Sequence, residues 1–434
     1  MSRSHNFRSF QMKSSLKRWC LALIFLFGGM IPALAANHPA NLDALVEEAL
    51  ANNPEIKASE ARWQAFAERV GQAGTFDDPM LMLKIQNALV RDPLAFDRDV
   101  MTAKVIGVSQ MLPFFGKRAL QREGAERAAE GERWSFEERK LELRSMVKET
   151  WYQLYFVDRS REIVEKNIGI LDDLTRFTET MYGVGQGLQQ DVLKTQVERS
   201  KMEDMRISLR QKRRSLEATL NALLFRPAGA AVPAISEVDL TPIDFEDAEL
   251  ERLAAENRPL IRALAAQVEK ARISRKLGEK EFYPDFTVSL EYMQRDPAMG
   301  EKGFDMYGAG VTFNLPVQRQ RRHAMIAEAE AETRMAQEEL NMLRNRIRLG
   351  IADGLARLER SRKLAELYRR GILPQAGHSL EAAMAAYRVG KADFMNVLDS
   401  QMKLFGFERE YYEAVAEHQM QLAVLEGVVG KELP

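Results

Sequence analysis

The sequence contains an internal repeat, and the second copy lies about 205 residues after the first. The segment from Asn53 to Ile56 (NPEI) returns as Arg258 to Ile261 (RPLI), and later landmarks keep this spacing within two residues. These landmarks pair Pro79 with Pro284, Arg91 with Arg295, Pro113 with Pro316, Tyr182 with Tyr387 and Gly185 with Gly390. Repeat periods of about 20–50 residues are typical of solenoids, so a period this long indicates a duplicated subdomain. We therefore expect two homologous units, residues 41–226 and 247–430, joined by a connector at residues 227–246.

Residues 1–35 have the features of a cleaved signal peptide. Five cations between Arg3 and Arg18 precede a short apolar run from Trp19 to Ile31, and an Ala-Leu-Ala cleavage pattern ends at Ala35. The run is shorter than the about 20 residues that a membrane helix needs, and an uncleaved anchor is the alternative. Cys20 is the only cysteine. Cleavage would therefore leave an exported chain with no thiol, no disulfide and no lipid-bearing cysteine.

The charge balance limits the possible partners. Loss of the five cations of the signal peptide changes the formal net charge from −1 to −6. A mildly acidic surface argues against nucleic acid as a partner. Beyond the signal peptide, no segment offers 18 uncharged apolar residues, so we do not expect helices to carry the mature chain across a membrane.

Each half is predicted to contain a helix, two strands and then two long helices. The expected strands are Met80–Leu89, Met101–Leu112, Asp285–Gln294 and Phe304–Leu315. Apolar and polar residues alternate along them with a period of two, most clearly at Phe286, Val288, Leu290 and Tyr292. In the second strand the apolar side is assigned to Met101, Ala103, Val105 and Met111. Strands of about ten residues suit a tilted transmembrane β-strand, although a small soluble sheet packed on the helices fits the same alternation.

The helices are expected to be long and to pack on one another. The first spans Leu42–Ala73, and four longer ones span Lys117–Met181, Gln189–Leu224, Arg319–Ile372 and Asp393–Val428. Helices of this length exceed what a globular core can bury, so they should form a coiled-coil-like bundle.

If the four strands lie in a membrane, they must pair with strands from other copies of the chain. An open sheet edge in lipid leaves backbone groups unpaired, at a cost of several kcal/mol each. Small barrels begin at about eight strands. Two copies of the chain would supply eight strands and three copies twelve, and the strand count alone leaves both open.

Several motifs resemble those of TolC-type outer-membrane efflux proteins, and the resemblance covers essentially the whole mature chain. The motifs are EALANNPEIKASEAR (48–62), GVSQMLPFFGKR (107–118), YGVGQGLQQDVL (182–193) and its echo YRVGKADFMNVL (387–398). The resemblance implies an α+β membrane protein: a homotrimer with a 12-stranded β-barrel in the outer-membrane lipid, continuous with a long α-helical barrel in the periplasm of a Gram-negative bacterium. It also implies a passive exit duct of a tripartite efflux pump. Such a duct works with a periplasmic membrane-fusion adaptor and an inner-membrane transporter, here favoured as the RND type.

The same resemblance supplies candidate functional residues. The turns between long helices would contact the adaptor, through Tyr182, Gly185, Gly187, Tyr387, Gly390 and Lys391. Just past the turns, threefold symmetry would bring side chains into rings that narrow the tunnel. The candidates are Asp191, Lys194, Asn396 and Asp399. Residue 396 is an amide where the family carries an acidic residue, and this weakens such a ring. The alternative is that these side chains lie on an ordinary solvated helix face and form no gate.

No residue set predicts catalysis, a metal site or a cofactor. The mature histidines (His38, His323, His378 and His418) are scattered and no glycine-rich phosphate loop follows a strand. The eighteen mature methionines include several on or near the strands, where packing is the usual role and a path for Cu(I) the less usual one. The PFFGKR segment (113–118) resembles the heavy-metal-exporting branch of the family. A periplasmic coiled-coil adaptor or scaffold, a duct for type I protein secretion and a hydrolase are the alternative functions.

Overall fold

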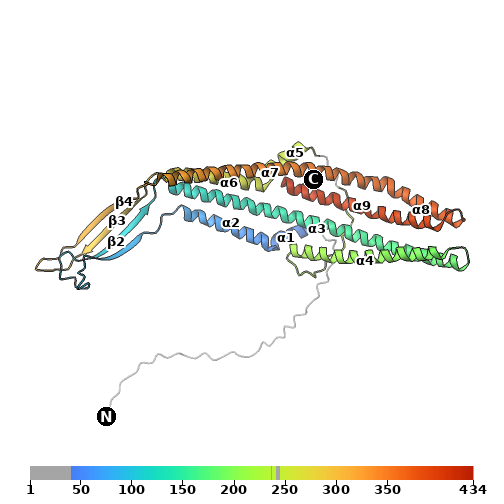
Figure 1. Ribbon diagram of the computed structural model, residues 1–434, viewed down its shortest axis with the longest axis horizontal. Helices are drawn as coiled ribbons and strands as arrows, with labels where there is room; N and C mark the ends of the chain where they lie inside the picture. Colours follow the sequence, from blue (N-terminus) through green and yellow to red (C-terminus); the bar gives the residue numbers. More distant parts are fainter. Residues whose placement is uncertain (1–40, 236, 241–244, 434) are drawn as a thin grey trace, which may run out of the picture. The chain divides into compact units, whose positions relative to one another are not determined.

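The computed structural model describes residues 41–235, 237–240 and 245–433. The predicted signal peptide and parts of the predicted connector lie outside the described residues. Long helices join a small antiparallel sheet at one end to two tight turns at the other (Figure 1). The elements are α1 (Leu42–Asn52), α2 (Pro54–Ala73), β1 (Met80–Gln86), β2 (Ala103–Leu112), α3 (Lys117–Gly183), α4 (Gln189–Leu223), α5 (Asp247–Asn257), α6 (Pro259–Lys280), β3 (Phe286–Gln294), β4 (Met306–Phe313), α7 (Arg319–Leu367), a π-helix (Tyr368–Ile372), α8 (Leu373–Arg388) and α9 (Phe394–Val429).

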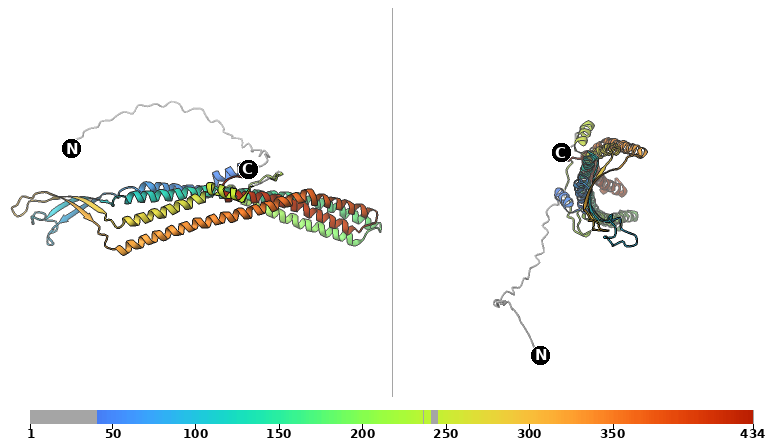
Figure 2. Two further views of the ribbon diagram at one scale, coloured as in Figure 1. Left: turned by 90° about the horizontal axis from the view of Figure 1, so that it is seen from above. Right: turned by 90° about the vertical axis from the view of Figure 1, so that its left-hand side faces the viewer.

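The longer helices lie side by side in one curved layer, and the short helices α1 and α5 lie outside it (Figure 2). Near the sheet their order is α2, α3, α6, α7, and near the turns it is α4, α3, α9, followed by α7 and α8. The 67 residues of α3 give it a length of roughly 100 Å at 1.5 Å per residue. Because a single layer has two free edges, α2 and α4 end it on one side and α7 and α8 end it on the other.

The predicted helix Leu42–Ala73 is wrong as one helix, because it breaks at Asn53. Proline disfavours helical geometry in the residue before it, and Asn53 is extended at φ −62 and ψ 125. The Asn53 side chain accepts a hydrogen bond from the backbone N–H of Glu55 at 2.8 Å and donates to the Leu223 carbonyl at 3.0 Å. Arg258, before Pro259, has the same geometry and donates to the Gly427 carbonyl. The duplication therefore extends to individual hydrogen bonds.

The helix predicted to end at Ile372 is also wrong, because it continues through a π-helical turn into α8. Buried residues of α7 match buried residues of α3 at a shift of 204: Ile347, Ile351, Gly354 and Leu358 match Leu143, Val147, Thr150 and Leu154. The turns beyond the π-helix match at 205. A π-helical turn accommodates one extra residue in an α-helix. It therefore absorbs the residue by which the second half is longer over this stretch.

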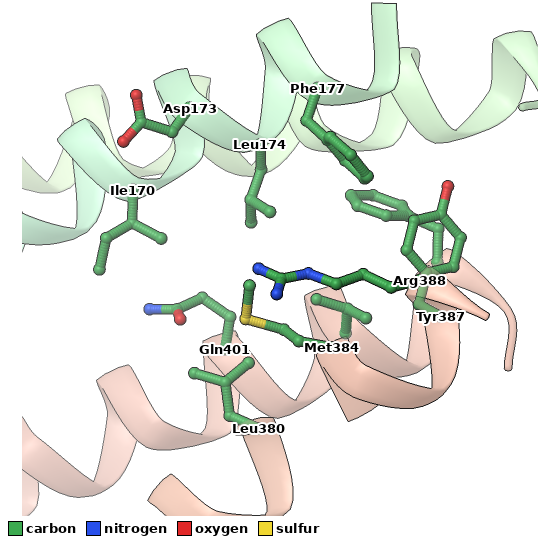
Figure 3. Close-up of a pocket in the computed structure, with 11 residues that line it drawn as sticks. Ile170, Asp173, Leu174, Phe177, Leu380, Met384, Tyr387, Arg388 and Gln401 are labelled. Atoms are coloured by element: carbon green, nitrogen blue, oxygen red, sulfur yellow. The ribbon is translucent and has the colours of Figure 1, made fainter. Parts of the chain in front are cut away.

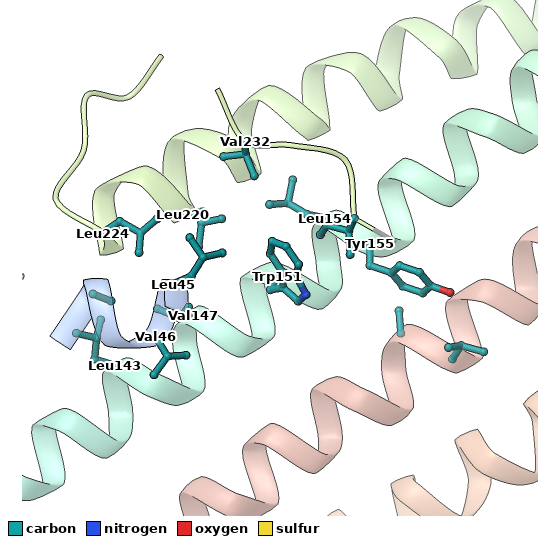
Figure 4. Close-up of a cluster of buried hydrophobic side chains, with 14 of the residues drawn as sticks. Leu45, Val46, Leu143, Val147, Trp151, Leu154, Tyr155, Leu220, Leu224 and Val232 are labelled. Atoms are coloured by element: carbon teal, nitrogen blue, oxygen red, sulfur yellow. The ribbon is translucent and has the colours of Figure 1, made fainter. Parts of the chain in front are cut away.

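The largest core cluster lies where α1, α3 and α4 meet the connector and α9 (Figure 4). Trp151, Leu154 and Tyr155 of α3 lie at its centre, each at most 5% exposed. Burial of each large apolar side chain stabilises the folded state by about 1.5–3 kcal/mol. This cluster fixes the short helix and the connector against the middle of α3.

The four strands form one antiparallel sheet in the order β1, β2, β3, β4. Each strand lies inside its predicted segment and is shorter. The first strand ends before residues 87–89, because Asn87 has a positive φ of 54°. The second strand begins only at Ala103, because residues 99–102 form a turn in which the Thr102 N–H donates to the Asp99 carbonyl. None of the helices in the described ranges is long and apolar enough to cross a membrane.

The register divides the sheet into two chemically distinct faces. One face, here called the apolar face, is mainly aliphatic and aromatic over all four strands, and many of its side chains are exposed. It carries Leu81, Leu83, Ile85, Ile106, Val108, Leu112, Phe286, Val288, Leu290, Tyr292, Tyr307, Val311 and Phe313. Its polar residues are Lys104, Gln110 and Gln294. The opposite face, here called the small-residue face, carries Gly107, Ser109, Ser289, Gly308 and Gly310 together with Lys84 and Glu291, whose charged atoms lie 4.0 Å apart.

The prediction of which residues form the apolar side of the second strand is wrong. Ile106 and Val108 lie on the apolar face, whereas Ala103, Val105 and Met111 lie on the small-residue face. The partners across the strands decide this, because Ile106 is opposite Leu83 and Tyr292.

Candidate functional site

Two tight turns end the helices, and they share one hydrogen-bond pattern. In the first, the Gly185 N–H donates to the Tyr182 carbonyl at 3.0 Å and the Gln186 N–H to Met181 at 2.9 Å. In the second, the N–H groups of Gly390 and Lys391 make the same bonds to Tyr387 and Ala386, at 3.0 and 2.9 Å. This is the Schellman pattern, which requires a left-handed residue. Gly185 and Gly390 supply it at φ +75 and +71.

The two turns differ in what surrounds them. Tyr387 packs between Phe177 and Phe394, with ring centroids 5.8 and 5.5 Å away, whereas Tyr182 is 50% exposed. Asp393 caps α9 by accepting from the Met395 N–H at 3.4 Å, whereas Leu188 provides no side-chain cap for α4. Gly187 is closely approached: a Cβ there would lie 3.0 Å from the Met181 Cβ. Exposed apolar side chains project from both turns, at Val184, Leu188 and Val389.

The four gate candidates occupy different surroundings. Asp191 is only 5% exposed within the chain, while its repeat partner Asn396 is exposed. The pKa of Tyr387 is raised, mainly because its hydroxyl is buried. The negative charges of Asp191 and Asp393 raise this pKa further. Asp399 is exposed and pairs with Lys403 one helical turn later, at 2.8 Å. In the described part of the chain no ion pair involves Lys194. Within one chain, Asp191 is therefore buried and its carboxylate acts on the pKa of Tyr387, whereas Asn396 and Asp399 are exposed on α9.

A groove of about 310 Å³ lies beside the second turn, between α3, α8 and α9 (Figure 3). Its wall is mainly apolar, with Leu174 and Phe177 from α3 facing Leu380 and Met384 from α8. Sequence reasoning missed this groove, because its walls come from helices about two hundred residues apart.

The histidines serve local roles. His418 is buried, with its Nδ1 3.3 Å from the Ser361 hydroxyl, and the His323 ring lies 5.2 Å from Phe282. His378 is exposed and lies 3.5 Å from Glu381. His38 lies outside the described residues. Within the described ranges, no group of three or more His, Cys, Asp or Glu side chains is placed to hold a metal ion.

Known proteins share this architecture. The model of the family described as outer membrane efflux protein matches residues 45–224 and 250–431, one segment in each half. Cobalt-zinc-cadmium resistance protein CzcC of Cupriavidus metallidurans is 24% identical over 409 residues, which cover 93% of each chain. Outer membrane efflux protein BepC of Brucella suis is 24% identical over 419 residues, covering 94% of this chain and 88% of that protein. The crystal structure of the outer membrane protein VceC from Vibrio cholerae superposes with a TM-score of 0.75 at 18% identity, covering 91% of this chain and 97% of that one.

Proposed function

The chain belongs to the outer membrane efflux protein family, and from this premise we propose that three copies of it form the exit duct of a tripartite efflux pump. Proteins of this family are efflux channels of the Gram-negative outer membrane rather than enzymes. The observation that carries the proposal is the exposed apolar face of the sheet, joined directly to long helices with solvated surfaces. This combination does not suit a soluble periplasmic scaffold, which would cover such a face with its own helices.

Two free edges support assembly from several copies. β1 and β4 end the sheet and run antiparallel, so β4 of one copy can pair with β1 of the next. On the same side as β4, α7 exposes Met335, Met342 and Leu349 at intervals of seven residues. On the opposite edge, α2 exposes the small residues Ala58, Ala61 and Ala65. Large side chains facing small ones at heptad spacing suit a coiled-coil contact between neighbouring copies. Cyclic repetition of this contact closes both the sheet and the helical layer.

We propose that the two helix turns dock a periplasmic adaptor, which in turn engages an inner-membrane transporter of the RND type. Gly390→Val tests this, because valine at φ +71 costs roughly 1–2 kcal/mol of backbone strain. A Cβ at Gly390 meets nothing within 4 Å, so the effect comes from the turn itself. We expect export and adaptor cross-linking to fall while the trimer stays intact in size measurements.

Gly377→Val is the matched control for this turn. Gly377 lies within α8, where an added Cβ also meets nothing within 4 Å. Export should stay normal in this control. Normal export and normal adaptor cross-linking in Gly390→Val would remove the turn from the docking surface.

We propose that Asp399 helps to close the duct near the turns, with Asp191, Lys194 and Asn396 around the same level. Three exposed carboxylates around a threefold axis attract cations and narrow the opening. Asp399→Ala should therefore raise the single-channel conductance of the purified protein in planar bilayers and lower its cation selectivity. Wild-type protein that formed no channels at all would contradict the duct itself.

Glu413→Ala is the control for the gate. Glu413 is exposed on α9, two heptads beyond Asp399 on the same face and roughly 21 Å further from the turn. If only the region near the turns limits the current, this variant should conduct like the wild type. Equal conductance in Asp399→Ala and wild type would reject the gate and leave the duct standing.

A further inference from the structure

Aromatic side chains connect the apolar face of the sheet to the ends of the helices. Phe286 and Phe313 are directly opposed in the last residue pair of β3 and β4 on the helix side. The ring centroid of Phe115 lies 6.2 Å from that of Phe286 and 5.9 Å from that of Phe114. Phe114 in turn stacks on Tyr283 at 4.5 Å. Aromatic rings favour the level of the lipid headgroups at a membrane surface, so these rings mark where a lipid-facing surface of the sheet would end.

Lys280, at the end of α6, lies next to this stacked pair of rings. Its Nζ is 5.6 Å from the centroid of each of the two rings. Both carboxylates that flank it in sequence are already paired. Glu279 pairs with Arg275 at 3.4 Å, and Glu281 pairs with Lys117 at 3.3 Å. Among the described residues no ion pair involves Lys280, so its ammonium group is available to an anion from outside the chain.

The segments around Lys280 are positively charged. Residues 74–79, 116–122, 276–285 and 318–323 lie where the strands meet the helices, and together they contain eight Lys and Arg against five Asp and Glu. Their net charge of +3 contrasts with −1 for the whole chain. A second cation in this region also lies on an aromatic ring, because the Arg118 Cζ is 3.4 Å from the centroid of Phe76. This end of the sheet therefore attracts anions.

We propose that Lys280, with the rings of Phe114 and Tyr283, binds the headgroup of an anionic phospholipid in the periplasmic leaflet of the outer membrane. The site rests on the proposed function, which places the sheet in that membrane. The apolar face contacts the acyl chains, the aromatic rings lie at the level of the headgroups, and Lys280 lies one ring beyond. Lysine suits this place, because its stem can follow apolar surface while the ammonium group stays at the polar level.

The line of rings favours a lipid over free phosphate. Free phosphate would need only the cations, whereas the rings from Phe286 to Tyr283 form an uninterrupted apolar path between the sheet and Lys280. Phe115 and Tyr283 are 76% and 49% exposed in the single chain. An acyl chain and its headgroup can follow this path as one molecule.

Lipid binding to the purified full-length protein tests the site. Protein held on a resin in detergent is titrated with micelles that contain phosphatidylglycerol or phosphatidylcholine with the same acyl chains, and retained lipid per chain is measured by mass spectrometry. We expect the wild type to prefer phosphatidylglycerol. Lys280→Gln should weaken phosphatidylglycerol binding about fivefold, which is the contribution of one cation near an anionic surface. Phosphatidylcholine binding should not change, and Lys280→Arg should keep the preference.

Lys212→Gln is the matched control. Lys212 is exposed on α4, which lies in the part of the helical layer next to the turns (Figure 1), and no ion pair involves it in the described part of the chain. The same loss of charge at Lys212 should leave both lipid affinities unchanged. Equal affinity of the wild type for the two lipids, or equal losses in Lys280→Gln and Lys212→Gln, would overturn the site. Displacement of phosphatidylglycerol by excess inorganic phosphate at constant ionic strength would also overturn it.

Planar-bilayer conductance of the same samples separates this site from the duct. Channels formed by a protein without preference for phosphatidylglycerol would refute the lipid site and leave the duct standing. A protein that prefers phosphatidylglycerol through Lys280 and forms no channels would refute the duct and retain the lipid site.

Discussion

Leu290→Arg is expected to be strongly destabilising once the protein is in a lipid bilayer. Leu290 lies at the middle of β3 on the apolar face, between Val108 and Ala309, and is 60% exposed. An arginine on the lipid side near the bilayer midplane costs about 2–4 kcal/mol. Three copies in one barrel multiply this cost. We expect a large loss of folded protein in vesicles, measured by urea unfolding in lipid or by the yield of inserted trimer.

Ser289→Arg provides the comparison, because the two residues are neighbours in one strand. Ser289 lies on the small-residue face opposite Gly310, and an arginine there would extend into water inside a barrel. The free energy of unfolding should therefore change far less than in Leu290→Arg. Equal effects of the two substitutions would show that the apolar face does not contact lipid.

Alternation in the sequence predicts the strands well only where it is strong. In β3 the apolar residues recur at every second position, and the structure places them on one face. In β2 the phase was wrong, because Lys104 and Gln110 share the apolar face with Ile106 and Val108. The side chains of the flanking strands decide the face of β2, and they are distant in sequence. The sequence of β2 alone therefore cannot assign the faces of this strand.

The two helix errors have different physical origins. In one helix from Leu42 to Ala73, Pro54 would be an interior proline, which removes a backbone hydrogen bond and clashes with the preceding turn. After the break at Asn53 it is the first residue of α2, where proline is tolerated. The capping bond from Asn53 favours the break. The π-helix accommodates a residue that the second half has in addition to the first. The spacing between equivalent residues of the two halves grows from 203 at Pro113 to 205 at Tyr182. That growth is a visible signal of extra residues, but their position depends on which helix faces are buried.

The duplication predicts the backbone of the helix turns and not their environment. The same Schellman bonds occur at Gly185 and Gly390 because each turn is local. Asp191 and Asn396 align in sequence, yet only Asp191 is buried. α4 packs mainly on α3 of its own half, whereas α9 packs on both α3 and α7, so equivalence in the repeat does not imply an equivalent role. Any threefold gate would therefore be built from residues of unlike surroundings.

Met342→Glu should prevent trimer formation at micromolar protein concentration. Met342 is 47% exposed in the single chain and lies between Met335 and Leu349 on the free edge of α7. Burial of a methionine stabilises by about 1.5–3 kcal/mol, and an unpaired carboxylate at the same place adds a desolvation penalty of several kcal/mol. Each trimer contains three such contacts. Size-exclusion chromatography with light scattering, in detergent, should show mainly monomer.

Asn341→Glu separates this effect from the added charge. Asn341 is exposed, adjacent to Met342 and about 100° around the helix, away from the apolar stripe. The control introduces the same carboxylate on the same helical turn, so it should remain trimeric. A trimeric Met342→Glu would show that the α7 stripe faces solvent in the assembly, and closure would then depend on the strand edges alone. Dissociation of both variants would point to a general effect of an added carboxylate on this part of α7, and neither the apolar stripe nor the alanines of α2 would then be needed to explain it.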